Sequence, residues 1–129
     1  MNTTTITTNP ASLSLPNLLL RVEGAALFAA GIVIFAQQGG AWWVFALLLL
    51  TPDLAMLPYL FSPRAGAISY NIIHTIALPL LFLLIGAGAE SSAIVQAAAI
   101  WLSHIGMDRV VGYGLKYVSG FKDTHMQRV

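Results

Sequence analysis

The sequence predicts an all-α integral membrane protein, an up-down-up-down bundle of four transmembrane helices with both termini on the cytoplasmic side. Three observations support this class. Of the 129 residues, 57% are hydrophobic and only 9% are charged, and the mean hydropathy is +0.78. A soluble domain would carry roughly a quarter charged residues, so this chain has too little polar surface to cover a globule in water. Its apolar residues also fall into four segments of about 20 residues, the length that crosses a bilayer.

Short connections separate the four predicted spans. A Thr-rich tail of residues 1–15 precedes the transmembrane domain of residues 16–113, and a more polar tail of residues 114–129 follows it. Because helix connections of about four to six residues leave little room, neighbouring helices must be antiparallel. The spans are expected at residues 17–36, 41–61, 66–86 and 92–111.

Proline residues predict interruptions within the second and third spans. Pro52 lacks the backbone N–H that a helix interior uses, and Pro58 follows six residues later, so we expect the second helix to be kinked or opened there. Pro79 predicts a kink in the third span. Carbonyls freed by an opened helix are tolerated within a bilayer only where they line a cavity or pack on protein.

The basic residues predict the orientation. All six Lys and Arg residues lie at the end that holds both termini, whereas the opposite connections contain only Glu90. This asymmetry indicates cytoplasmic termini. The expected surroundings are therefore a lipid bilayer, and no basic stripe interleaved with aromatic residues predicts a nucleic-acid partner. The chain has no cysteine, which excludes disulfides and thiolate metal sites.

Five ionisable residues lie within the apolar segments at a similar depth. At about 1.5 Å per residue, Asp53, His74 and His104 each lie roughly 12 Å from the cytoplasmic end of their helices. Asp108 follows His104 by one turn on the same helix face. Glu23 lies roughly 9 Å from the start of the first helix. Because charges in hydrocarbon are costly, five at one depth predict a shared site.

Three interpretations of this polar layer compete. In the first, the layer is structural: its hydrogen bonds fix helix register and mediate assembly, including assembly into a homo-oligomer. In the second, it is a metal site for Zn, Mn or Fe. In the third, it is a proton relay, or a haem lies between the two histidines. The relay is weakened because the path outward from the layer, residues 78–81, is Leu-Pro-Leu-Leu.

The metal site is the leading hypothesis. Its ligands would be Asp53, His74, His104 and Asp108. Glu23 would be a further ligand or general base, and Glu23 and Arg109 are the candidate catalytic side chains. Such a site would make the protein a metal-dependent hydrolase acting on a small or lipid-like substrate from the cytoplasmic side. In the polar tail, Asp123 and His125 could add ligands, although an isolated Asp-x-His there is more typical of a solvated tail.

Three stretches of the chain resemble a known family. They are GGAWWVFALLLLTPDLAMLPYL, GAISYNIIHTIALPLL and WLSHIGMDRVVGYGLKYVSGFKDTH, and they resemble small bacterial membrane proteins of the domain-of-unknown-function 4260 family. The resemblance covers roughly residues 18–129, and it departs at Pro58, where family members often have Gly. It implies a location in the inner membrane of a bacterium and no particular activity. The motifs fall on Glu23, Pro52-Asp53, Tyr70-Asn71, His74, His104, Asp108-Arg109, Gly112–Tyr117 and Phe121–His125.

Overall fold

A computed structural model of the protein describes residues 14–115, which form five α-helices and one 3-10 helix without any strand. The predicted all-α class is therefore confirmed for this part of the chain. The two predicted tails fall almost wholly outside it, and so do Asp123 and His125. The elements are α1 (Leu15–Gln37), α2 (Trp42–Leu48), η1 (Thr51–Leu60), α3 (Pro63–His74), α4 (Ala77–Gly88) and α5 (Ser92–Val111).

Two or three of the four predicted spans are long and apolar enough to cross a membrane. One is α1, and the second is the segment Trp42–Leu60 that combines α2 and η1. The helices α3 and α4 make a third candidate if they are taken together, although a bend of 41° separates them. The helix α5 has the length of a span, but its polar side chains lower its mean hydropathy.

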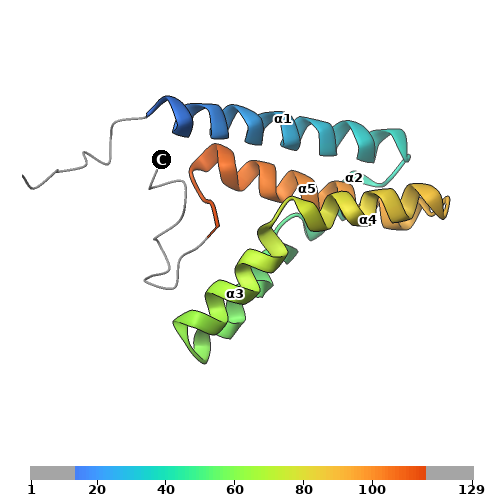
Figure 1. The fold of residues 1–129 in the computed structure, drawn as a ribbon. Coiled ribbons are helices and arrows are strands. Elements are labelled where there is room, and N and C mark those ends of the chain that lie inside the picture. The colour runs from blue at the N-terminus through green and yellow to red at the C-terminus, as the bar shows by residue number, and fades with distance from the viewer. Residues whose placement is uncertain (1–13, 116–129) are drawn as a thin grey trace, which may run out of the picture.

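The helix α5 lies at the centre of the structure. It packs against both α1 and α4, whereas α3 packs against η1. In Figure 1, α1, α4 and α5 lie side by side, and α3 and η1 form an arm that leaves them at an angle. Eleven residues of α5 are buried, compared with four of the longer α1. The polar side chains of α5 therefore have protein around them.

Small residues let α1 and α5 approach closely. Gly24 and Gly31 on α1 face α5, and Gly106 on α5 faces α1. A Cβ atom added to Gly106 would lie 2.5 Å from the backbone O of Gly24 and 2.5 Å from the backbone N of Phe28. Close to this point, the Ser103 hydroxyl donates to the Phe28 carbonyl at 3.3 Å. Small residues and interhelical hydroxyl bonds are typical of helix packing within membranes.

The second span opens where Pro52 predicts an interruption. The helix α2 ends at Leu48, and η1 begins at Thr51 with Pro52 in its first turn. The amide of Asp53 donates to the Leu50 carbonyl at 3.1 Å instead of to the Leu49 carbonyl, which an α-helix would use. The Leu49 carbonyl is thereby released from the helix.

The third span breaks slightly before the expected position. The helix α3 ends at His74, Thr75 has an extended backbone, and α4 begins at Ala77. Pro79 therefore lies in the first turn of α4, where its missing N–H costs no helical hydrogen bond. In a continuous helix, the Thr75 carbonyl would accept a hydrogen bond from the N–H of residue 79, which a proline lacks. The helix therefore breaks before Pro79.

Substituting Gly106 by Ala is expected to destabilise the protein by about 1–3 kcal/mol. The new methyl group would clash with backbone atoms of Gly24 and Phe28, and no side-chain rotation can relieve such a clash. The melting temperature in detergent measures the effect. Gly88→Ala is the matched control, since no atom lies within 4 Å of a Cβ at Gly88. Equal melting temperatures for the two variants would contradict the close approach of α1 and α5.

Candidate metal centre

The structure brings together all four residues that the sequence predicts as metal ligands. Asp53 comes from η1, His74 from the last position of α3, and His104 and Asp108 from adjacent turns of α5. One potential ligand atom from each residue lies within 4.8 Å of the others, so this group could hold a metal ion. Glu23, which is expected at the same depth, is exposed on α1 and does not belong to the group.

Five of the six distances between these atoms are close to those between ligands of one small ion, and all six lie within 4.8 Å. His74 Nε2 lies 3.3 Å from Asp53 Oδ1 and 3.5 Å from Asp108 Oδ2. His104 Nε2 lies 3.1 Å and 3.2 Å from the same two oxygens. The two Nε2 atoms are 3.1 Å apart. In a tetrahedral zinc site with bonds of about 2.0–2.1 Å, neighbouring ligand atoms lie about 3.3–3.4 Å apart.

Backbone carbonyls orient both imidazole rings. His104 Nδ1 lies 2.6 Å from the Leu49 carbonyl, and His74 Nδ1 lies 2.9 Å from the Tyr70 carbonyl. A carbonyl can only accept a hydrogen bond, so each Nδ1 atom must carry the proton. In the neutral ring this leaves the Nε2 lone pair directed at the group. Histidines that bind metals almost always donate their other ring N–H in this way.

Opening of the second span supplies one of these carbonyls. The Leu49 carbonyl, released from the helix at Pro52, accepts from His104 Nδ1. The interruption therefore has two effects at once: it frees an acceptor that sets the tautomer of His104, and it places Asp53 beside the imidazole. Within a bilayer, a free carbonyl is tolerated where it packs on protein in this way.

Four electron-rich atoms thus converge in a buried space. The residues His74 and His104 are only 2% and 0% exposed, so water screens them little. With both rings neutral, their lone pairs face each other and two carboxylates without an intervening positive charge. A cation among the four atoms, or a proton on an Nε2 atom, removes this repulsion. The arrangement therefore suits one of two states, a site with a bound metal ion or a hydrogen-bond network with a protonated histidine.

Access to the group is uneven. The side chain of Asp53 is 33% exposed, whereas that of Asp108 is 12% exposed. The route from outside therefore passes Asp53 on η1, and the other three residues form the inner wall.

Two aromatic residues position His74. The Tyr70 ring stacks on the His74 ring with centroids 3.7 Å apart and an angle of 11° between their planes. The Trp101 indole N–H donates to the Ile73 carbonyl at 2.6 Å and so joins the end of α3 to α5. Trp101 was not among the site residues predicted from the sequence, although it lies three residues before His104.

Arg109 lies beside the group on α5. It is buried and interacts electrostatically with Tyr70, Asp108 and Glu23. The two candidate catalytic side chains, Glu23 and Arg109, therefore interact electrostatically with each other. Only Arg109 is next to a member of the group in the sequence, and its positive charge partly balances the negative charges of Asp108 and Glu23.

The chain belongs to the family described as Domain of unknown function (DUF4260), which it matches over residues 17–129. The resemblance found in the sequence is thereby confirmed over nearly the whole chain. No curated protein and no solved structure matches it.

Replacement of Trp101 by Phe is expected to destabilise the protein by about 1–3 kcal/mol, because it leaves the half-buried Ile73 carbonyl without its donor. Thermal unfolding in detergent provides the measurement. The control is Trp43→Phe, since Trp43 is 70% exposed and its loss should change stability by no more than about 0.5 kcal/mol. Equal melting temperatures of the two variants would contradict the role of Trp101 in joining α3 to α5.

Proposed function

We propose that this protein is a multi-pass membrane protein whose functional centre is a divalent metal ion bound by Asp53, His74, His104 and Asp108. One observation carries the proposal: both histidines donate Nδ1–H to backbone carbonyls while their Nε2 atoms converge with two carboxylates. A purely structural hydrogen-bond network does not require both rings to be fixed in the same metal-binding tautomer.

Zinc fits the ligand set best among Zn, Mn and Fe. Two imidazoles and two carboxylates suit all three metals. Five of the six ligand separations are 3.1–3.5 Å, close to those around a compact four-coordinate ion, which zinc prefers. Manganese and iron more often take additional ligands, and no further His, Asp or Glu of the described residues belongs to the group.

Hydrolytic chemistry places a specific demand on Asp53. A zinc ion with four protein ligands is closed, whereas hydrolytic sites keep one position open and use the ion as a Lewis acid. Asp53 is the most exposed member of the group, so it is the ligand that can yield its position to a small or lipid-like substrate. The remaining three residues would retain the ion, and the released carboxylate could accept a proton.

The proposed topology has four spans with both termini in the cytoplasm of a bacterial cell. The spans would be α1, α2 with η1, α3 with α4, and α5. Large exposed side chains such as Leu47, Leu57 and Leu84, which are 68%, 59% and 71% exposed, support contact with lipid on several elements. The polar helix α5 is compatible with this arrangement because α1 and α4 pack against it.

A structural role is the second candidate function. The same separations of 3.1–3.5 Å are also hydrogen-bond and ion-pair distances, so a single proton on one Nε2 atom would connect η1, α3 and α5 into a stable network. In that case the protein is non-enzymatic and its polar layer fixes the packing of the helices.

A haem between the histidines has less support. Axial ligands of a haem lie on opposite faces of the porphyrin. Here the two imidazole planes meet at 65°, and the Nε2 atoms are 3.1 Å apart with carboxylates beside them. No plane of that size fits between them in this arrangement.

Purified wild-type protein is expected to contain close to one equivalent of a divalent metal, with zinc as the leading candidate, and His74→Ala/His104→Ala is expected to contain almost none. The double variant removes both nitrogen ligands, so the remaining carboxylates cannot retain the ion. Elemental analysis of the detergent-purified protein measures this directly, and an absorption spectrum would detect haem.

The matched control is His125→Ala, which removes the third histidine of the chain, a residue that is not among the four proposed ligands. Its metal content should equal that of the wild type. Folded, metal-free wild-type protein would contradict the metal centre and favour the structural network. Asp53→Asn should retain metal with reduced affinity, because three ligands remain.

Single cysteines test the topology, because the natural chain contains none. In spheroplasts, a membrane-impermeant maleimide should label Gln37→Cys at the end of α1 and Ala89→Cys just after α4, both on the proposed outer side. It should not label Phe61→Cys, an 87% exposed position in the cytoplasmic connection, until the cells are lysed. Labelling of all three before lysis would contradict the proposed orientation.

A further inference from the structure

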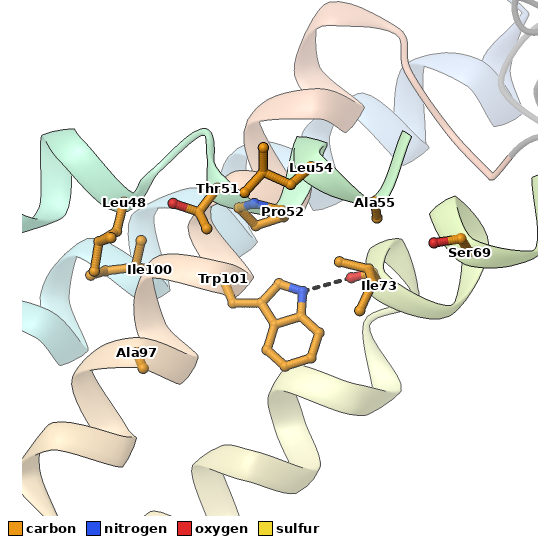
Figure 2. A pocket seen from close by; sticks show the side chains of 10 residues that line it. All are labelled: Leu48, Thr51, Pro52, Leu54, Ala55, Ser69, Ile73, Ala97, Ile100 and Trp101. Carbon is orange, nitrogen blue, oxygen red and sulfur yellow. Dashed lines mark hydrogen bonds between the residues drawn. The ribbon is translucent and has the colours of Figure 1, made fainter. Parts of the chain in front are cut away.

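A cavity of about 550 Å³ lies beside the four-residue group and opens to the molecular surface. Figure 2 shows its walls, which come from α2, η1, α3 and α5. Its volume falls within the range of roughly 300–1,000 Å³ that is typical of ligand pockets. The cavity is not part of the metal centre, since none of the four ligands lines it.

The chain segments that carry the ligands also build this cavity. Pro52 and Leu54 line it on either side of Asp53 in the sequence, and Ile73 lines it immediately before His74. On α5, Ile100 lines it four residues before His104, a distance of about 6 Å along the helix. A molecule that occupies the cavity is therefore held one helical turn from the metal centre.

The lining of the cavity suits hydrocarbon. Eight of its ten residues are apolar, and the exceptions, Thr51 and Ser69, offer only hydroxyl groups. The indole N–H of Trp101 is already donated to the Ile73 carbonyl at 2.6 Å, as Figure 2 shows. Trp101 therefore presents only its apolar ring to an occupant. A charged or strongly polar molecule would lose its hydration there without finding partners.

The entrance of the cavity lies on an apolar part of the surface. Leu48 and Leu54 line the cavity and are 39% and 62% exposed. Both belong to the segment Trp42–Leu60, which is long and apolar enough to cross a membrane. An acyl chain in the bilayer can therefore enter sideways, without crossing water.

We propose that the cavity binds one acyl chain of a membrane phospholipid and thereby presents the polar end of that lipid to the group formed by Asp53, His74, His104 and Asp108. The inference rests on the proposed function where it makes this lipid the substrate of the centre. It narrows the substrate from a small or lipid-like molecule to a lipid with a long hydrocarbon chain. The partly exposed Asp53 is the member of the group that the polar end would meet first.

Photolabelling tests occupancy of the cavity. The probe is phosphatidylglycerol with a diazirine in one acyl chain, present at a low fraction in phosphatidylcholine nanodiscs that hold the metal-loaded protein. Mass spectrometry should locate an adduct on Ile100, which lines the cavity and is only 3% exposed. Lipid that merely slides over the surface would instead label exposed leucines.

A variant that fills the cavity provides the decisive comparison. Ala97 lines the cavity and is exposed, so Ala97→Phe adds a ring to the cavity without disturbing the buried core. Labelling of Ile100 should fall by about tenfold, the loss expected when roughly two methylene groups are no longer buried. Ala93→Phe, one turn away on the same helix and outside the cavity, is the matched control and should label like the wild type.

Metal retention provides a second measurement. Phospholipid should slow the extraction of the bound ion by a chelator in the wild type and in Ala93→Phe, because the lipid's polar end covers the centre. It should have no such effect in Ala97→Phe. Equal extraction rates in all three proteins would overturn the placement of the polar end at the centre.

The possible failures can be told apart. Metal-bearing wild-type protein with no adduct on Ile100 would mean that a protein segment fills the cavity or that it stays empty, and it would overturn the acyl-chain proposal while leaving the metal centre intact. Wild-type protein without metal would overturn the proposed function. In that case, labelling of Ile100 that Ala97→Phe abolishes would still support the acyl-chain site.

Discussion

The hydrogen bond between His104 Nδ1 and the Leu49 carbonyl is the interaction on which the site depends. It exists because the second span opens at Pro52 and releases that carbonyl from its helical partner. The bond fixes the tautomer of His104, joins the central helix to the interrupted segment, and brings Asp53 within 3.1 Å of the imidazole. An uninterrupted α-helix would use this carbonyl internally and could not orient the ring with it.

The polar residues of α5 lie on the helix that the other elements cover, as a buried polar site in an apolar chain requires. Ionisable side chains are costly in hydrocarbon, but α5 is covered by α1 on one side and α4 on another. Close packing at Gly24 and Gly106 is what lets α1 cover α5 without bulky side chains between them. The apolar elements at the surface thus protect a central helix that is itself less apolar.

The sequence predicted the four residues of the group because depth along a helix follows directly from a rise of about 1.5 Å per residue. The same reasoning placed Glu23 at this depth, yet Glu23 is exposed, since depth does not say which way a side chain faces around the helix axis. Proline positions predicted the opening at Pro52, whereas the break at Thr75 precedes Pro79. The bond between Trp101 and the Ile73 carbonyl depends on how α3 meets α5, and no local pattern encodes that.

Asp53 distinguishes the structural from the catalytic interpretation of the site, because only a catalytic site needs one ligand that can move. Three members of the group lie on the regular helices α3 and α5 and are nearly enclosed, so their positions are fixed by packing. Asp53 instead lies on the 3-10 segment η1, which has no buried residue of its own, and its side chain is one-third exposed. Because 3-10 segments longer than a turn or so hold their backbone less firmly than α-helices, η1 can adjust at lower cost than α3 or α5. A group with three rigid members and one adjustable carboxylate can hold a cation firmly and still open one position, which a wholly rigid structural network has no need to do.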